Sequence, residues 1–188
     1  DTEIMGWVIK NSEGRNWEDK ILTSFNKFQG AFSMISLTKN KLIAFRDTFG
    51  FRPLVLGQLN DSYVVCSETC ALDTVGAKFI REVAPGEIIV IDDKGMRSVG
   101  KIRSPKKAFC LFEYVYLARP DSIFDKQLVH QVRQRSGEIL AHESPVGADM
   151  VVAVPDSGTS AAIGYSKASG IPYGEVLIKN RYKKRYAL

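Results

Sequence analysis

The sequence contains no long apolar run and few cysteines, and both features narrow the possible classes of protein. No apolar stretch approaches the roughly 20 residues that cross a bilayer, so we expect neither a membrane span nor a membrane partner. The three cysteines include no Cys-x-x-Cys pair. They predict no disulfide framework and fit a reducing, cytoplasmic location. No signal peptide, internal repeat or low-complexity stretch is visible.

The basic charge is concentrated at one end of the chain. The net charge is +5, and without the basic residues of the last ten positions the chain holds 21 acidic and as many basic residues. Nucleic-acid binders usually spread their charge over a face and interleave aromatic residues, so no nucleic-acid partner is expected. The cluster fits half of a mobile loop that closes over a polyphosphate, or a solvated tail. It consists of Lys179, Arg181, Lys183, Lys184 and Arg185.

The first half of the chain predicts helices followed by antiparallel strands. Helical spacing covers residues 4–9 and 17–28, and the period then changes to that of short strands. Turn residues at 39–40, 60–61 and 92–95 separate those segments, which is typical of antiparallel sheets. The predicted strands are 31–37, 41–46, 54–59, 63–67, 87–91 and 97–99, with a short helix at 68–75.

The second half predicts a parallel sheet. A polar, basic segment with Pro105 marks a domain boundary near residue 104, which divides the chain into residues 1–104 and 105–188. Strand 150–154, helix 160–169 and strand 173–178 form a βαβ unit. A further helix is predicted at 129–142. The residues expected on or near its buried face are Val129, Val132, Ser136, Ile139 and Leu140.

The residues after strand 150–154 form the most informative motif. They make a tight polar loop, 155–159, that opens a helix of small residues. A helix N-terminus leaves backbone N–H groups unpaired and favours an anion. Gly158 permits close approach of the backbone, and a carboxylate at Asp156 is explained best by Mg²⁺ or a sugar hydroxyl. An ordinary N-cap and turn explain the loop equally well. The hydroxyls available are those of Ser157, Thr159 and Ser160.

Further motifs stand in a fixed order along nearly the whole chain. They are Asp1-Thr2-Glu3, Gly30-Ala31-Phe32, Arg46-Asp47, Gly50-Phe51-Arg52-Pro53-Leu54, Ser67-Glu68-Thr69, Arg81-Glu82-Val83, Pro85-Gly86-Glu87, Phe112 through Ser122, Gly170-Ile171-Pro172-Tyr173 and Lys179-Asn180-Arg181-Tyr182. Together with the loop at 155–159, this ordered set resembles the glutamine-dependent amidophosphoribosyltransferases of purine synthesis.

The resemblance implies an α+β and α/β fold class. Residues 1–104 would be the C-terminal part of an N-terminal-nucleophile (αββα) glutamine amidotransferase type 2 domain. Residues 105–188 would be the N-terminal part of a type I phosphoribosyltransferase domain. The implied enzyme transfers ammonia from glutamine to phosphoribosyl pyrophosphate and forms 5-phosphoribosylamine, the first step of de novo purine (IMP) biosynthesis.

Two alternatives to this enzyme stay open. One is another glutamine amidotransferase, such as a glucosamine-phosphate synthase, although the loop at Pro155 argues against it. The other is a non-catalytic relative that keeps only phosphate binding. The resemblance also implies purine nucleotides as feedback inhibitors, and a homo-oligomer, either tetramer or dimer.

The glutamine site is represented by a single residue. Asp1 matches the family's aspartate for the substrate's α-amino group, a role that needs a carboxylate acceptor; it would also serve as a helix N-cap. The family's nucleophile is an N-terminal cysteine whose own amine is the base. That cysteine, the arginine clamp and the oxyanion donors have no match here, so the chain looks like an interior segment without catalytic residues.

The phosphoribosyl site is represented more fully. The family's pyrophosphate loop matches Asp156, Ser157, Gly158 and Thr159, with Ser157 as an Mg²⁺ contact beside two aspartates of a later loop. Lys179 and Arg181 match the flexible loop over the sugar diphosphate, although residues 183–188 depart from its usual continuation. Asp92-Asp93 has the wrong setting for the later loop and is interpreted as a hairpin turn.

Metal ligation by cysteine or histidine has little support. Cys110 matches a ligand of a four-iron four-sulfur cluster (4Fe–4S) in one branch of the family, and such clusters need about four thiolates. A small buried apolar residue is the interpretation favoured for Cys110. His130 and His142 lack partners at ligand spacing, so each is expected to be a surface or hydrogen-bonded histidine.

Overall fold

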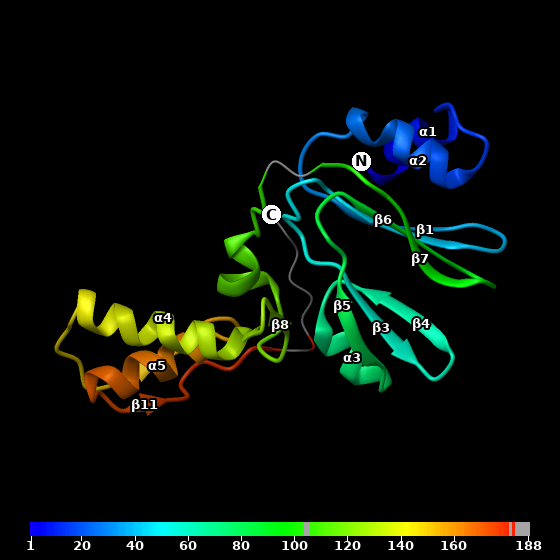
Figure 1. The fold of residues 1–188 in the computed structure, drawn as a ribbon. Coiled ribbons are helices and arrows are strands. Elements are labelled where there is room, and N and C mark those ends of the chain that lie inside the picture. Colours follow the sequence, from blue (N-terminus) through cyan, green and yellow to red (C-terminus); the bar gives the residue numbers. More distant parts are fainter. Residues whose placement is uncertain (104–105, 181, 183–188) are drawn as a thin grey trace. The chain divides into compact units, whose positions relative to one another are not determined.

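The computed structural model describes residues 1–103, 106–180 and 182, which belong to two compact units (Figure 1). The first unit is Asp1–Cys110 and the second is Leu111–Leu188. The predicted boundary near residue 104 lies a few residues before the boundary between these units, which follows Cys110.

The described residues of the first unit form two antiparallel sheets and three α-helices. One sheet has the strand order β1-β2-β6-β7 and the other β4-β3-β5. The helices are α1 (Thr2–Lys10), α2 (Trp17–Ser24), which continues into a 3₁₀ turn at Phe25–Lys27, and α3 (Thr69–Val75). The strands are β1 (Ser33–Leu37), β2 (Leu42–Arg46), β3 (Val55–Leu59), β4 (Ser62–Cys66), β5 (Lys78–Glu82), β6 (Glu87–Asp92) and β7 (Gly95–Lys101).

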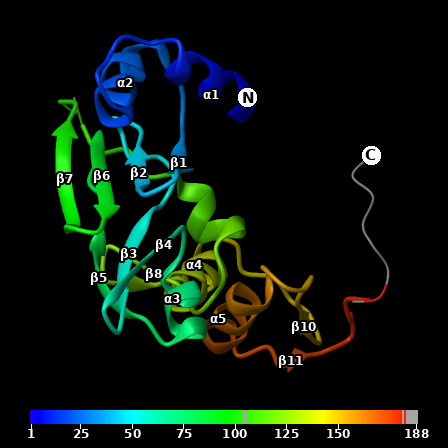
Figure 2. The same cartoon turned by 90° about the vertical axis from the view of Figure 1, so that its right-hand side faces the viewer.

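Alternating apolar residues stack these elements into four layers, with α1 and α2 outside one sheet and α3 outside the other (Figures 1 and 2). Alternate residues of a strand face opposite sides of its sheet. Ile43 of β2 therefore packs with α1 and α2, whereas its neighbour Ala44 packs with Leu56 of the second sheet. Val55 of β3 faces the other way, toward Leu72 of α3. The predicted αββα arrangement is confirmed.

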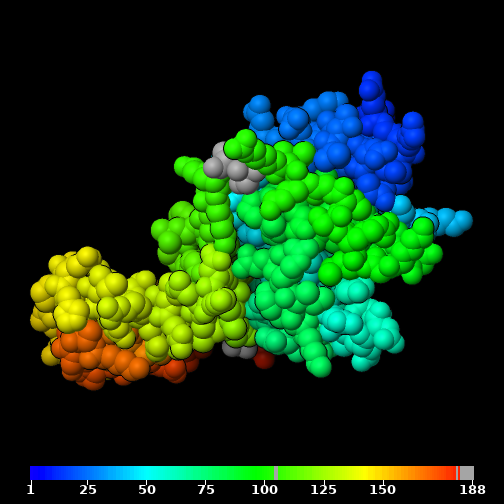
Figure 3. Space-filling view, in the orientation of Figure 1, coloured from blue at the N-terminus to red at the C-terminus, as the bar shows by residue number. Residues whose placement is uncertain are grey.

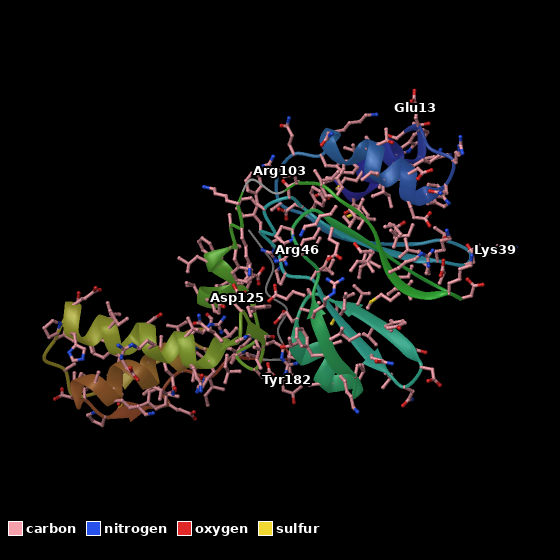
Figure 4. All side chains as sticks on the ribbon, in the orientation of Figure 1. Glu13, Lys39, Arg46, Arg103, Asp125 and Tyr182 are labelled. Atoms are coloured by element: carbon pink, nitrogen blue, oxygen red, sulfur yellow. The ribbon has the colours of Figure 1, made fainter. Side chains whose placement is uncertain are left out.

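A buried arginine and aspartate join the loops of the first unit. Arg46 is fully buried, and its guanidinium donates to the backbone oxygens of Arg52 (2.6 Å), Val83 (2.8 Å) and Gly50 (2.9 Å) (Figure 4). The Asp47 carboxylate accepts from the N–H of Phe49 at 2.9 Å and also from Phe51 and Phe32. Because a buried charge needs partners, Arg-Asp in this motif is structural.

Strand β5 was not among the predicted elements. Its Phe79 and Ile80 are 52% and 38% exposed, so the segment has little of the one-sided burial that marks a strand in sequence. It forms because β3 pairs with it along one edge and with β4 along the other. The predicted helices and the remaining strands of this unit are found within a few residues of their expected positions.

The second unit is built around two helices and a short parallel pair of strands (Figure 2). Val151 pairs with Tyr173 and Val152 with Gly174, which confirms the predicted parallel βαβ unit. Its paired segments are shorter than predicted, because only these residues find a partner strand in the described part of the chain. The elements are a π-helical turn (Glu113–Leu117), β8 (Ile123–Phe124), β9 (Gln127–Leu128), α4 (Val129–Glu143), β10 (Val151–Val152), α5 (Thr159–Ser169) and β11 (Tyr173–Gly174).

The turn between β8 and β9 was missed because its sequence is unusual. Asp125 and Lys126 both have positive φ, 47° and 64°. Two-residue hairpin turns of this kind favour Asn-Gly or Asp-Gly, and Asp-Lys does not carry that signal.

Helices α4 and α5 approach so closely that only glycine fits at their crossing. A Cβ on Gly137 would overlap the carbonyl oxygen of Ala161, and a Cβ on Gly164 would overlap that of Gln134. The atoms of the two helices are in continuous contact (Figure 3). The backbones therefore pack directly on one another.

This crossing corrects the predicted buried face of the first of these helices. Ile139 and Leu140 are 43% and 51% exposed, and Ser136 is also exposed. The face that is buried has a spacing of four and places small residues and an arginine against the neighbouring segments. Its members are Val129, Arg133, Gly137 and Ala141.

We predict that Gly137→Ala destabilises the fold. Helix propensity alone would favour alanine by about 1 kcal/mol, but the added methyl group meets backbone that cannot move aside, which costs ~1–3 kcal/mol. Urea unfolding measures the difference. Gly147→Ala is the control, because no atom lies within 4 Å of its Cβ position. A stabilised Gly137→Ala protein would contradict the close crossing.

Candidate functional site

The candidate site is the loop that joins β10 to α5. After the buried Ala153, residues 155–158 form a turn that leads directly into the helix at Thr159. The Gly158 N–H donates to the Val154 oxygen at 3.2 Å, and the Thr159 N–H donates to the Asp156 oxygen at 3.3 Å. The peptide bond between Pro155 and Asp156 is cis.

The first turn of α5 offers unpaired backbone donors. The first bond of the helical type runs from the Ala162 N–H to the Gly158 oxygen, at 2.9 Å. The N–H groups of Ser160 and Ala161 have no hydrogen-bond acceptor among the described residues. From the sequence, the backbone N–H groups of Gly158 through Ser160 would be the expected donors. In the structure Gly158 and Thr159 are used within the turn, so the principal donors are one residue further along.

Gly158 has a steric role within the protein itself. Its φ of −74° is open to any residue. A Cβ there would lie 2.8 Å from the carbonyl oxygen of Val154, a distance that forces the turn to shift. Glycine thus lets the helix begin directly against the end of the preceding strand.

A carboxylate and an ammonium meet at the mouth of the loop. Lys179 Nζ lies 2.6 Å from Asp156 Oδ2, and both side chains are substantially exposed. A cavity of about 270 Å³ adjoins this pair, and a second of about 240 Å³ shares Pro155, Asp156 and Lys179 with it. The first cavity is lined by Tyr116, Leu117, Pro155, Asp156, Ser157 and Lys179.

The three hydroxyls of the motif have different environments. Ser157 lines the cavity, and Thr159 lines the second cavity. Ser160 is only 3% exposed, and its Oγ lies 2.9 Å from His130 Nδ1. Its hydroxyl is therefore used between the two helices, and the expectation that it adds to an anion site is wrong. His130 is hydrogen-bonded and His142 is exposed, as predicted.

Sequence reasoning missed the wall formed by Tyr116 and Leu117. Arg133 of α4 holds this wall, donating to the backbone oxygens of Tyr114 and of Ala118, the latter at 2.8 Å. Arg133 is 4% exposed. A basic residue at the centre of a helix face that is otherwise small was the available signal, since a buried arginine must find several acceptors.

The other predicted site residues lie in different places. Asp1 caps α1, its carboxylate accepting from the Thr2 N–H at 2.7 Å. Cys110 is half-buried and donates its N–H to the Phe51 oxygen. No group of three metal-ligating side chains occurs among residues 1–103, 106–180 and 182. Arg181 lies outside the described residues.

The interpretation of Asp92-Asp93 as a hairpin turn is confirmed. The pair lies at the turn between β6 and β7. Arg97 makes two hydrogen bonds of 2.7 Å with the Asp92 carboxylate and lowers its pKa to about 2.

Comparison with known proteins gives, first, a match to a domain family. Residues 1–74 match the glutamine amidotransferase domain family. Over 98% of its length the chain is 46% identical to the amidophosphoribosyltransferase of Bacillus subtilis and 51% identical to that of Archaeoglobus fulgidus. It covers 39% and 41% of those proteins, so it spans about two-fifths of the curated relatives it matches.

Solved structures extend the match to the fold. A structure described as "the allosteric regulatory enzyme of purine biosynthesis" superposes over 100% of this chain and 40% of its own, with a TM-score of 0.92 at 46% identity. The B. subtilis glutamine phosphoribosylpyrophosphate amidotransferase complexed with ADP and GMP superposes over 97% of this chain and 40% of its own (TM-score 0.88, 46% identity). Over nearly its whole length the chain is thus similar to part of the amidophosphoribosyltransferases, and its predicted fold class is confirmed. Among the described residues no helix is long and apolar enough to cross a membrane.

We predict that Gly158→Ala weakens binding of pyrophosphate without unfolding the protein. The methyl group would push the turn away from Val154 and tilt the donors of α5. A loss of about tenfold, equivalent to ~1.4 kcal/mol, is expected. Calorimetric titration measures the affinity, and thermal unfolding checks the fold. With Gly147→Ala as the control, equal affinities in both variants would refute a steric role for Gly158.

Proposed function

We propose that the full-length protein transfers ammonia from glutamine to phosphoribosyl pyrophosphate and releases 5-phosphoribosylamine, glutamate and pyrophosphate. This would be the first step of de novo purine (IMP) biosynthesis. The observation that carries the proposal is the 155–158 turn, which opens α5 with the N–H groups of Ser160 and Ala161 unpaired among the described residues. Relatives named for this activity match the chain over 98% of its length.

The turn would bind the pyrophosphate that leaves during the reaction. Backbone donors and the dipole of α5 favour a polyanion at this end of the helix. They are fixed before the ligand arrives, so they would stabilise charge that develops on the leaving group without reorganising. Lys179 adds a cation beside the loop, and Arg181 would add a second in the loop that covers the sugar diphosphate.

The residues of the turn fit a magnesium ion bound through the substrate. Asp156 and Ser157 supply a carboxylate and a hydroxyl, the hard oxygen donors that Mg²⁺ prefers beside phosphates. Bound Mg²⁺ would neutralise the charge of the leaving pyrophosphate. Lys179 holds the Asp156 carboxylate at 2.6 Å, so the chain itself balances this negative charge until a cation-bearing substrate enters.

The glutamine half is represented here by Asp1. Asp1 caps α1, so its carboxylate lies at the start of the helix. A carboxylate is suited to bind the ammonium group of glutamine. The cysteines present do not fit the nucleophile, since each lies within the chain and burial raises the pKa of the Cys66 thiol. We therefore propose that residues 1–188 alone do not hydrolyse glutamine.

Other partners follow from the family with less direct support. A B. subtilis relative is described in complex with ADP and GMP, so purine nucleotides are proposed as feedback inhibitors. A dimer or tetramer, and an iron–sulfur cluster with Cys110 as one ligand, also belong to the proposal. Cys110 would supply one of the about four thiolates that such clusters use.

The activity itself is tested by Ser157→Ala in the full-length protein. The variant should lose about 10- to 100-fold in synthesis from ammonia, since one metal or phosphate contact is worth ~1–3 kcal/mol. It should keep glutamine hydrolysis. A protein that binds phosphate but forms no phosphoribosylamine would favour the non-catalytic alternative. Glucosamine phosphate as the product from glutamine would favour a glucosamine-phosphate synthase.

We predict that Asp1→Ala raises the KM for glutamine while synthesis from free ammonia survives. Only the glutamine half would use this carboxylate. Asn16→Ala is a matched control, because Asn16 caps α2 by accepting from the Asp19 N–H at 2.8 Å. Each cap is worth ~1 kcal/mol of stability, so both variants lose stability but only Asp1→Ala changes the KM. Equal loss of both activities would make Asp1 purely structural.

We predict that Asp156→Asn has opposite effects with and without Mg²⁺. Without metal, pyrophosphate should bind about fivefold tighter, because a like charge worth ~1 kcal/mol is removed. With metal, the gain in affinity that Mg²⁺ gives the native protein should disappear. Asp121→Asn is the control, since it removes another exposed carboxylate paired with a cation, Arg119. An unchanged Mg²⁺ dependence would remove Asp156 from the metal site.

A further inference from the structure

One helix, α4, holds both walls of the candidate cavity. We propose that His130 of this helix is a positioning residue for the pyrophosphate loop, acting through its hydrogen bond to Ser160. The inference rests on the proposed function, because it assigns His130 a role in presenting the donors of α5 to the phosphoribosyl substrate.

The first step of the argument is the position of Ser160. Its backbone N–H is one of the unpaired donors, while its side chain is 3% exposed and lies 2.9 Å from the imidazole. Removing the hydrogen-bond partner of a buried hydroxyl destabilises the folded protein. The hydrogen bond with His130 therefore resists any rotation of the first turn of α5, and so fixes the direction of the Ser160 N–H.

The second step is that His130 is itself held in place. The backbone N–H of His130 donates to the backbone oxygen of Pro120 at 2.8 Å. The backbone N–H of Val129 donates to the backbone oxygen of Ser122 at 2.9 Å. Further along the same helix, Gly137 packs directly on the carbonyl of Ala161. The first turn of α5 is thus fixed to α4 at two successive residues, Ser160 and Ala161, which are the two that carry the free donors.

The third step is that α4 also holds the opposite wall of the cavity, which is formed by Tyr116 and Leu117. Arg133 lies three residues after His130 on α4 and binds the backbone oxygens of Tyr114 and Ala118, which flank Tyr116 and Leu117. Movement of α4 would displace both walls together. His130 and Arg133 therefore fix the two walls to the same helix, although neither lines the cavity.

The experiment uses the full-length protein with phosphoribosyl pyrophosphate and ammonia, so that the glutamine half does not contribute. His130→Ala and Ser160→Ala should each raise the KM for phosphoribosyl pyrophosphate by about 3- to 10-fold, the size of one net hydrogen bond, with kcat nearly unchanged. The double variant should be no worse than either single one, because both remove the same bond. His130→Asn should restore much of the affinity, since its amide can reach the same hydroxyl.

Ser166→Ala supplies the matched control. It removes a hydrogen bond of 2.7 Å to the Ile171 oxygen at the other end of α5, so it reports the effect of loosening the helix alone. Additive losses in the double variant, or an equal rise in KM in Ser166→Ala, would overturn the positioning role. So would an unchanged KM in the Ala variants. If His130→Ala fails to fold, His130→Asn and Ser160→Ala carry the same test.

Failure of the proposed function gives a different result. It would appear in the unmodified protein, as no phosphoribosylamine formed from ammonia. Titration with inorganic pyrophosphate would then decide the positioning role separately, with weaker binding in His130→Ala and Ser160→Ala than in Ser166→Ala as the supporting outcome. Equal binding in all three would contradict it.

Discussion

The candidate site depends on a direct contact between the backbones of two helices. Gly137 and Gly164 let α4 and α5 meet without intervening side chains, and such packing leaves little freedom for either helix to move. The N-terminus of α5 is consequently held at a fixed place beside β10. The turn at 155–158, its free N–H groups and the Ser160–His130 hydrogen bond lie at the end of α5 that this contact holds.

Electrostatics explains why the turn combines a helix N-terminus, which attracts anions, with a negatively charged carboxylate. A helix N-terminus attracts anions, yet Asp156 places a carboxylate at its mouth. Lys179 balances that carboxylate in the present structure, and a metal ion carried by a polyphosphate would balance it in the complex. On the proposed function, the loop would therefore discriminate between a bare anion and a metal-bound one. A simple phosphate cradle would have no need of the carboxylate.

The sequence predicts the layers well and the contacts poorly. Residues 42–45 and 88–91 are continuous apolar runs, because each side of these central strands is buried against a different layer. The sequence does not reveal β5, whose apolar residues are exposed. On the helix 129–143, apolar Ile139 and Leu140 suggested a face that is exposed, while glycine and arginine occupy the buried one. The loop was found from its order of residues, but its donors and the role of Ser160 depend on a partner helix that local patterns do not specify.

Amide hydrogen exchange tests the central claim most directly. Exchange of the Ser160 and Ala161 amides should slow when phosphoribosyl pyrophosphate and Mg²⁺ bind to the full-length protein, because these donors would then be hydrogen-bonded. The hairpin turn with Asp92 and Asp93 is the internal reference, and its exchange should not change. Slowing at that hairpin, with none at Ser160 and Ala161, would contradict the assignment of the pyrophosphate site to the start of α5.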